Sequence, residues 1–398
     1  MNRRSLILTS AALTSVATVG VLLAGPLQPP AGPITSTYKP LTDVEPRIAI
    51  NAANTPGDGN SSFRIAQPGS YYLAGNLSVG TGSGIEIAAS NVTIDLNGFA
   101  LTGSLISADG ITTDGLRDNI AIRNGTIANW GSDGINLATG GVGSGALIES
   151  VTVASNGAFG IRAGNRVVLR GCIARSNASD GFNLSSRAVV TDCVASQNGS
   201  RGFAVGAGST LTGCTATDNA SDGFSLPSST TVMHCTSSLN TGRGFFLGTG
   251  CTINGCTASS NGDHGIALST RCMAMNNNSI SNTNGGNTAA GIYVSGDINH
   301  VESNHCSANN VGIHVASGAN SVVAPNTCGQ SSPGTIEIKV SFPGAQAVLY
   351  RNIAEQHFLA PSPYDVNPSG VAPIVDVSDG QWLLGSPNTN HPWANFAH

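Results

Sequence analysis

Polar and apolar positions repeat every 21 residues between residues 156 and 281. If asparagine is taken as position 1 of each unit, apolar or small residues fall in pairs at positions 6 and 8, 12 and 14, and 17 and 19. A spacing of two is the alternation of a β-strand, because successive side chains of a strand point to opposite faces. Glycine, serine and asparagine lie between the pairs and favour corners. Each unit is therefore predicted to form three short strands.

Three columns of identical residues share this period. The columns are Gly160, Gly181, Gly202, Gly223, Gly244 and Gly265; Asn156, Asn177, Asn198, Asn219, Asn240, Asn261 and Asn282; and Cys172, Cys193, Cys214, Cys235 and Cys256. A short fixed period is typical of a solenoid, in which each unit buries its apolar face only against its neighbours. Leucine-rich repeats have a similar length, but they need a leucine framework and a helical segment that these units lack. The pattern predicts an all-β parallel β-helix with three sides.

The Asn-x-x-x-Gly-Ile/Phe repeats, together with the segment Asn-Val-Thr-Ile-Asp-Leu-Asn-Gly-Phe at residues 91–99, resemble the right-handed parallel β-helix (pectate-lyase-like) superfamily. That superfamily includes pectate lyases, polygalacturonases, alginate-modifying enzymes and several non-enzymatic periplasmic and phage proteins. The resemblance covers roughly residues 63–330 and implies a single-stranded, right-handed β-helix. Parallel crossovers in general favour the same hand. One fold hosts many functions, so the resemblance implies no single activity.

The first 26 residues have the pattern of an export signal. Arg3 and Arg4 precede an apolar run, Leu6–Leu23, which ends in Ala-Gly. The start resembles a twin-arginine signal, which would export the folded protein, although two arginines also suit a general secretory signal. The run is short and threonine-rich for an uncleaved membrane anchor. We expect a mature chain without a membrane span that is periplasmic, on the cell surface or secreted.

The rest of the chain divides by its periodicity. Residues 27–62 lack a period and are rich in Pro, Gly, Asn and Thr, which predicts a linker. Residues 63–334 are the predicted β-helix, with about eleven coils of 21–26 residues counted from Gly84 to Gly312. Residues 335–359 alternate again and are predicted to form a C-terminal cap or an added sheet. Residues 360–398 form a tail rich in Pro and Asn.

Composition narrows the possible functions. Of the 398 residues only 10% are charged and 5% aromatic, and the net charge is −5, which does not suit a nucleic-acid reader. The cysteine column is expected to be a line of buried thiols, because parallel Cβ vectors disfavour disulfides and a line of ligands does not converge on a metal. A bond between Cys306 and Cys328, which lie outside that column, stays possible. The asparagine column is expected to form a hydrogen-bonded corner ladder.

A charged column precedes the repeated glycine. It reads Asp180, Arg201, Asp222, Arg243 and His264, with Asp263 beside the last. Surface ion pairing explains this alternation, with about 0–1 kcal/mol for each exposed pair. The resemblance suggests instead a carbohydrate site, since β-helix lyases and hydrolases use carboxylates with Arg, Lys or His on one face. The candidate catalytic residues are then Asp222 or Asp263 as proton donor or cation ligand, Arg243 as neutraliser of a uronate, and His264 as base.

The outward side of the middle strand supplies further candidates. Together with the charged column, it gives Asp180, Arg201, Asp192 and His234 as candidate substrate-binding residues. No cofactor or metal is predicted; calcium stays open as an alternative, but no acidic cluster supports it, and a calcium site of the pectate-lyase type needs several close oxygen ligands. Two hypotheses stay open. In the first, the chain recognises a polysaccharide, with or without acting on it as a lyase, glycoside hydrolase or epimerase. In the second, it is a non-catalytic surface, adhesion or envelope scaffold protein, which its very regular repeats favour.

Overall fold

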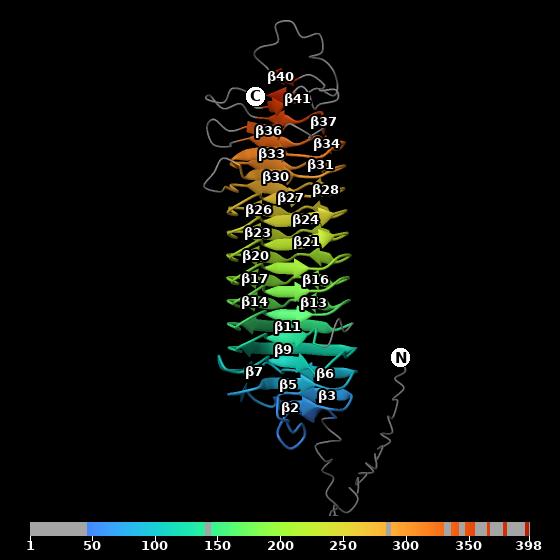
Figure 1. The fold of residues 1–398 in the computed structure, drawn as a ribbon, viewed down its shortest axis with the longest axis vertical. Helices are drawn as coiled ribbons and strands as arrows, with labels where there is room; N and C mark the ends of the chain where they lie inside the picture. Colours follow the sequence, from blue (N-terminus) through green and yellow to red (C-terminus); the bar gives the residue numbers. More distant parts are fainter. Residues whose placement is uncertain are drawn as a thin grey trace, which may run out of the picture. The chain divides into compact units, whose positions relative to one another are not determined.

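The computed structural model describes residues 46–139, 145–283, 288–329, 336–341 and 347–354, and three short strands at 364–366, 377–379 and 395–397. The predicted export signal, most of the predicted linker and most of the predicted tail lie outside the described residues. All secondary structure in the described part of the chain is β-strand (Figure 1). Among these residues no helix has the length and apolar character needed to cross a membrane.

One wall of the coil is a parallel sheet of fourteen strands, which we call sheet B, and Figure 1 shows its strands one above another along the middle of the view. In stacking order the strands are β2 (Ser61–Ile65), β5 (Ser83–Ile87), β8 (Ile111–Thr113), β10 (Ile135–Leu137), β12 (Ile161–Ala163), β15 (Phe182–Leu184), β18 (Phe203–Val205), β21 (Phe224–Ser228), β24 (Phe245–Thr249), β27 (Ile266–Leu268), β30 (Ala290–Val294), β33 (Val311–Val315), β36 (Ile336–Val340) and β39 (Tyr364–Val366). Fourteen strands enclose thirteen turns, close to the eleven coils predicted. The glycine column that was counted runs through eleven of these fourteen strands, and β2, β36 and β39 lie beyond it.

The other two walls belong to a second parallel sheet, because two long strands, β9 (Ile120–Ala128) and β11 (Leu147–Ala154), run through both. Wall A1 contains β1 (Ile48–Ala49), β3 (Gly69–Tyr72), β6 (Val92–Asp95), β13 (Val168–Arg170), β16 (Val189–Thr191), β19 (Thr210–Thr212), β22 (Thr231–Met233), β25 (Thr252–Asn254), β28 (Met273–Met275), β31 (His300–Glu302), β34 (Ser321–Val323) and β37 (Ala347–Leu349). Wall A2 contains β4 (Leu77–Ser78), β7 (Ala100–Thr102), β14 (Ile173–Arg175), β17 (Val194–Ser196), β20 (Thr215–Thr217), β23 (Thr236–Ser238), β26 (Thr257–Ser259), β29 (Asn278–Ile280), β32 (His305–Ser307), β35 (Thr327–Gly329), β38 (Ile353–Ala354) and β41 (Asn395–Ala397), and β40 (Val377–Asp379) pairs with β41. Three short strands per coil and a parallel all-β fold are thus confirmed.

The ladder of strands extends past the ends expected for the β-helix. Strand β1 lies in the stretch expected to be a linker and pairs with β3. Strands β36 and β37 lie in the stretch expected to be a cap, and they pair with β33 and β34 as a further coil. Both stretches lack the repeated glycine, so the glycine column alone underestimates the length of the ladder.

The interior of the stack is formed by identical residues in register. Phe182, Phe203, Phe224 and Phe245 are fully buried, and their rings stack at centroid distances of 4.7–4.8 Å. That distance is the spacing of neighbouring strands, about 4.8 Å, so each ring lies directly over the next. Burial of a Phe side chain contributes about 1.5–3 kcal/mol. The repeated aromatic position therefore locks the register of the central coils.

The asparagine column forms the expected ladder. Each buried side-chain amide from Asn156 to Asn282 donates to the side-chain oxygen one coil later, at 2.8–3.0 Å, and the last acceptor is Asn309. The same oxygen also accepts the backbone N–H of the preceding asparagine, at 3.1 Å in the pair Asn198 and Asn219. These bonds satisfy polar groups that the turn would otherwise leave unpaired inside the protein.

Candidate functional site

The outer face of sheet B carries one residue from the middle of each strand. Phe246 is an example, since its neighbours Phe245 and Leu247 are fully buried and it therefore points outward. We call the outward middle residues together with the charged column the sheet B face. Along the register the middle residues are Arg162, Asn183, Ala204, Ser225, Phe246, Ala267, Tyr293, His314 and Lys339.

The charged column forms two close ion pairs between adjacent coils. The Arg243 guanidinium donates two hydrogen bonds to the Asp222 carboxylate, at 3.2 and 2.8 Å. Arg201 donates to Asp180 in the same way, at 3.2 and 3.3 Å. The side chains of the two acids are only 11% and 1% exposed, whereas those of Arg243 and Arg201 are 32% and 40% exposed. Each pair therefore presents its arginine to solvent and covers its carboxylate.

A second contact explains why an acid stands in every other coil. The backbone N–H of Arg243 donates to Asp222 at 2.8 Å, and that of Arg201 donates to Asp180 at 3.0 Å. His264 occupies the equivalent position two coils after Asp222, and its Nδ1 accepts the backbone N–H of the next coil at 2.9 Å. Every second residue of the column is thus a hydrogen-bond acceptor for the corner that follows it. The alternation of charge has a structural cause.

The same acceptor position occurs in the longer early coils, at Asp133. Its carboxylate accepts the backbone N–H of Phe159 at 3.0 Å, and the backbone N–H of Asp133 donates to Asp109 at 3.0 Å. Burial raises the pKa of Asp133 to about 6, and the nearby Asp109 charge adds to the rise, while the Phe159 N–H opposes it. A carboxyl with such a pKa is a candidate for proton transfer, but here it is buried beneath the surface of the corner.

His264 is held as a neutral hydrogen-bond donor. Because its Nδ1 accepts the N–H of Ala290, the ring proton resides on Nε2. Burial lowers the pKa of His264; Asp263 opposes that change and Arg243 adds to it. The Asp263 carboxylate lies 3.7 Å from Nε2, beyond hydrogen-bond range. This geometry supplies an N–H group to a ligand, whereas the expected general base would need a free nitrogen lone pair.

Two aromatic rings lie beside these groups on the sheet B face. The imidazole of His264 stacks on Tyr293, with ring centroids 4.0 Å apart and planes 8° apart. His314, in the coil after Tyr293, lies edge-on to the Tyr293 ring at a centroid distance of 5.4 Å. The Arg243 guanidinium lies 4.1 Å from the centre of the Phe246 ring. Neither ring is among the candidates predicted from the sequence, although an aromatic residue between two buried positions of a strand was a signal for both.

Of the eight candidate residues, six lie on the sheet B face and two do not. Asp222, Arg243, Asp263 and His264 come from three consecutive coils, and Asp180 and Arg201 continue the same column. Asp192 and His234 stand at the corner between walls A1 and A2, both with φ of 53°. Their side chains lie against Gly213 and Gly255 of the next coils, where an added Cβ would approach within 2.4 and 2.8 Å. The structure therefore does not bring these two to the charged column.

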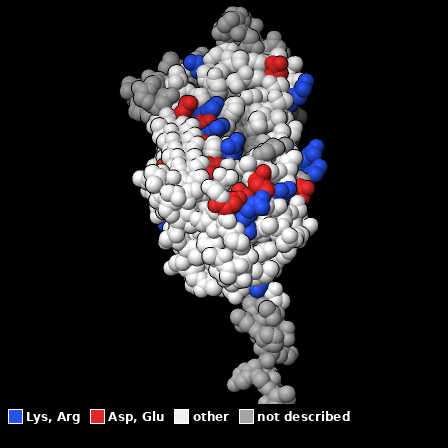
Figure 2. Space-filling view, turned by 60° about the horizontal axis from the view of Figure 1, so that its bottom comes forward, with Lys and Arg blue, Asp and Glu red and all other residues white. Residues whose placement is uncertain are grey.

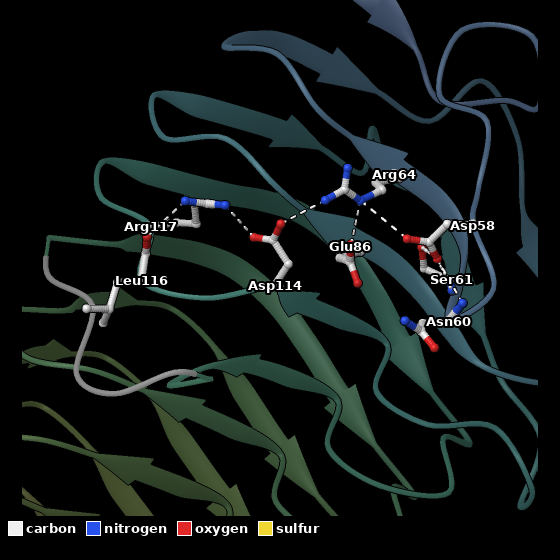
Figure 3. Close-up of polar contacts among 8 residues, drawn as sticks. All are labelled: Asp58, Asn60, Ser61, Arg64, Glu86, Asp114, Leu116 and Arg117. Carbon is white, nitrogen blue, oxygen red and sulfur yellow. Dashed lines mark hydrogen bonds and ion pairs between the residues drawn. The ribbon is translucent and has the colours of Figure 1, made fainter.

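A separate network of charges lies at the N-terminal end of sheet B (Figure 3). The Arg64 guanidinium binds Glu86 at 2.7 Å, Asp114 at 2.8 Å and Asp58 at 3.3 Å, and Arg117 binds the other oxygen of Asp114 at 2.7 Å. All five side chains are partly exposed, so this network links the first three coils with modest stabilisation.

Figure 2 shows how charges of both signs gather close together on the face in view, while large areas carry none.

No metal site is formed by the described residues, in the sense that no three His, Cys, Asp or Glu side chains converge there. Asp180 and Asp222 are bound to arginine, whereas the Asp263 carboxylate is 39% exposed and lies 3.7 Å from His264. What the face offers to a ligand is a set of guanidinium and imidazole N–H donors and one exposed carboxylate, Asp263, beside two aromatic rings.

Solved structures with a similar fold include enzymes and phage proteins. The A-module of the mannuronan C-5 epimerase AlgE4 from Azotobacter vinelandii matches with a TM-score of 0.53 and 16% identity, over 77% of this chain and 91% of that one. A point mutant of the periplasmic alginate epimerase AlgG matches with a TM-score of 0.47 and 13% identity, over 72% and 79%. A mutant tailspike protein of Escherichia coli bacteriophage HK620, in complex with a pentasaccharide, matches with 0.47 and 12%, over 91% and 80%.

At these identities the likeness concerns the fold. No curated protein matches the sequence significantly. The family model described as the right handed beta helix region matches residues 81–241, 140–283 and 247–356, which together span most of the described coils. With its parallel strands stacked in three walls and this match over more than half of its length, the chain belongs to the right-handed β-helix family.

Proposed function

We propose that this chain is an exported protein that recognises a polysaccharide along the sheet B face. One observation carries the proposal: Phe246 and Tyr293 hold aromatic rings at outward positions two coils apart, the first against the Arg243 guanidinium and the second stacked with the neutral His264 imidazole. Two coils span about 9.6 Å at the usual strand spacing, which is about the length of a disaccharide. Between the rings stands Ala267, whose small side chain leaves the wall low.

The chemistry of the face suits a sugar chain. Aromatic rings offer rigid apolar area on which the C–H faces of a pyranose pack. Beside them, guanidinium and imidazole N–H groups donate to hydroxyl or carboxylate oxygens, and arginine binds carboxylates in a bidentate manner. Because the acids of the column are covered and the arginines are exposed, an acidic polysaccharide is favoured over a neutral one. The AlgE4 module, whose name states that it acts on mannuronan, supports a ligand of this class for this fold.

Chemical modification of the bound glycan is the second candidate function. It is favoured by the meeting of Arg243, Asp263, His264 and Tyr293 within adjacent coils, because an acid, a neutral imidazole and a phenol are proton-transfer groups. The bond from the Ala290 backbone to His264 opposes the role of base for that residue. Recognition without catalysis is therefore the function that the geometry supports best.

The test is a screen of the purified chain against acidic and neutral polysaccharides, with and without calcium. Retardation in a polysaccharide-containing gel reports binding, while unsaturated-product absorbance, reducing ends and the proton spectrum of the polymer report elimination, hydrolysis and epimerisation. We expect retardation by an acidic polymer, weakened in Phe246→Ala. Turnover that is lost in His264→Ala or Asp263→Ala would establish the enzyme instead. No retardation by any polymer would reject the proposal and leave a scaffold protein.

A further inference from the structure

All nine cysteines of the chain are free thiols inside the stack. None has more than 1% of its surface exposed, and none is bonded to another. They occupy three interior columns, of which the sequence predicted the first and placed Cys306 and Cys328 outside it. The columns are Cys172, Cys193, Cys214, Cys235 and Cys256; Cys251 and Cys272; and Cys306 and Cys328. No role on the sheet B face uses any of these thiols.

Each thiol stands next to another in the neighbouring coil. The backbone N–H of Cys214 lies 3.4 Å from the sulfur of Cys235, and that of Cys235 lies 3.4 Å from the sulfur of Cys256. Cys306 in β32 and Cys328 in β35 are direct register partners on wall A2, in successive coils. The Cα atoms of such partners are about 4.8 Å apart, but their side chains point in parallel, which disfavours the disulfide geometry. The folded stack therefore keeps the thiols both close and reduced.

In an unfolded chain the same cysteines are free to form disulfides with one another. In the main column they are 21 residues apart, and loops of this length close at small entropic cost. A disulfide-carrying oxidant takes two protons and two electrons from any two thiols, becomes a dithiol and leaves a new S–S bond. Nothing in a 21-residue repeat selects one partner. A bond between Cys172 and Cys256 joins positions that the fold separates by four coils, about 19 Å, so such a product is unable to stack.

This conflicts with an exported chain unless folding comes first. Compartments outside the cytoplasm are oxidising, and exposed thiols there form disulfides. Arg3 and Arg4, which lie outside the described residues, have the pattern of a twin-arginine signal. We infer that this chain folds in the reducing cytoplasm and crosses the membrane already folded, with Arg3 and Arg4 as the signal, because its nine in-register thiols survive oxidation only once they are buried. The inference does not depend on which glycan is bound.

The experiment uses the full chain in a bacterium that possesses both export routes. One strain makes the native chain, the second makes the Arg3→Lys/Arg4→Lys variant, and the third makes the chain behind a general secretory signal. Exported and retained protein are treated with iodoacetamide with and without denaturant, and mass spectrometry counts the alkylated cysteines. We expect exported native protein with no accessible thiol before unfolding and nine after it, and a lysine variant that stays inside with the same count.

The third strain separates folding from routing. Behind the general signal we expect a disulfide-linked, protease-sensitive chain, and we expect nine thiols and protease resistance to return when the host lacks its extracytoplasmic thiol oxidase. The inference is overturned if the lysine variant is exported as efficiently as the native chain, if native exported protein carries disulfides, or if the general signal delivers a folded chain with nine thiols in the oxidising host.

Discussion

The Asp222 carboxylate accepts three hydrogen bonds from Arg243 in the next coil, one from the backbone N–H and two from the guanidinium, at 2.8–3.2 Å. The acid thus joins two coils at a corner whose backbone N–H has no strand partner. Asp180 and Arg201 repeat the arrangement two coils earlier. The acids of the charged column therefore hydrogen-bond the corner backbone of the next coil, and the arginines form the exposed side of the column.

Replacement of Asp222 is predicted to lower the free energy of unfolding more than replacement of Arg243. Asp222→Ala leaves both the Arg243 backbone N–H and the guanidinium without their acceptor, so we expect a loss of about 1–3 kcal/mol in the free energy of unfolding. Arg243→Ala removes a partly exposed charge and costs about 1 kcal/mol or less. Asp222→Asn keeps an oxygen for the backbone and recovers part of the loss. Urea denaturation of the three variants measures this, and equal small losses for all of them would mean surface pairing alone.

The pH dependence of stability is predicted to include a contribution from His264. Its pKa in the folded state is lowered, mainly by burial, so below the ordinary value of about 6.5 the unfolded chain binds the proton more readily. Stability from this residue is therefore present above about pH 6.5 and decreases as the pH falls towards the folded pKa. His264→Asn keeps an acceptor for the Ala290 N–H without titrating in this range. Melting curves from pH 7.5 to 5 are expected to fall less steeply for the variant, and parallel curves would contradict the burial of a neutral imidazole.

Substitution of an asparagine in the middle of the ladder is predicted to lower the free energy of unfolding strongly. Asn219→Ala removes the acceptor for the Asn198 backbone and side-chain N–H groups and the donor to the Ala195 carbonyl. Each buried group left unpaired costs about 1–3 kcal/mol, so we expect a total loss of at least about 3 kcal/mol. Asn76→Ala, in an exposed turn with a single bond to Ala100, is the control and is expected to change little. Similar midpoints for both variants would show that the ladder is dispensable.

The aromatic stack is predicted to lose much of its stability when one of its rings is removed. Phe224 lies between two parallel rings with centroid distances of 4.7 Å, so Phe224→Ala opens a cavity that its neighbours are unable to fill. We expect a loss of about 3–5 kcal/mol, and a smaller one for Phe224→Leu. Guanidinium denaturation measures both. A loss below about 1 kcal/mol for the alanine variant would indicate that adjacent coils close the gap.

Much of the fold follows from the 21-residue period. Identical residues one coil apart must lie side by side in a stacked sheet, which makes the asparagine ladder and the buried thiols predictable. Phe246 and Tyr293 were predictable in the same way, because the position between two buried residues of a strand faces outward. Asp192 and His234 alternate in their column with glycine, a sign of a corner with positive φ rather than of a binding surface.

Other contacts depend on details that the period does not contain. The acceptor role of Asp222 depends on which backbone N–H a corner leaves without a strand partner. The stacking of His264 on Tyr293 depends on the longer coil between Gly265 and Gly291, where Ala290 replaces the large residue of the column. The coils beyond the glycine column were left out of the predicted coil count because their strands keep the alternation but not the glycine.

The affinity for an acidic polysaccharide, compared between variants of the sheet B face and of wall A1, decides whether the sheet B face binds the glycan. Titration calorimetry with the polymer that retards the native chain would compare it with Phe246→Ala, Tyr293→Ala and Met273→Ala, the last an exposed apolar residue of wall A1. We predict about tenfold weaker binding for each variant of the sheet B face, equivalent to about 1.4 kcal/mol, and unchanged binding for Met273→Ala. Full affinity in both face variants, with loss in Met273→Ala, would place the glycan on another wall and contradict the account.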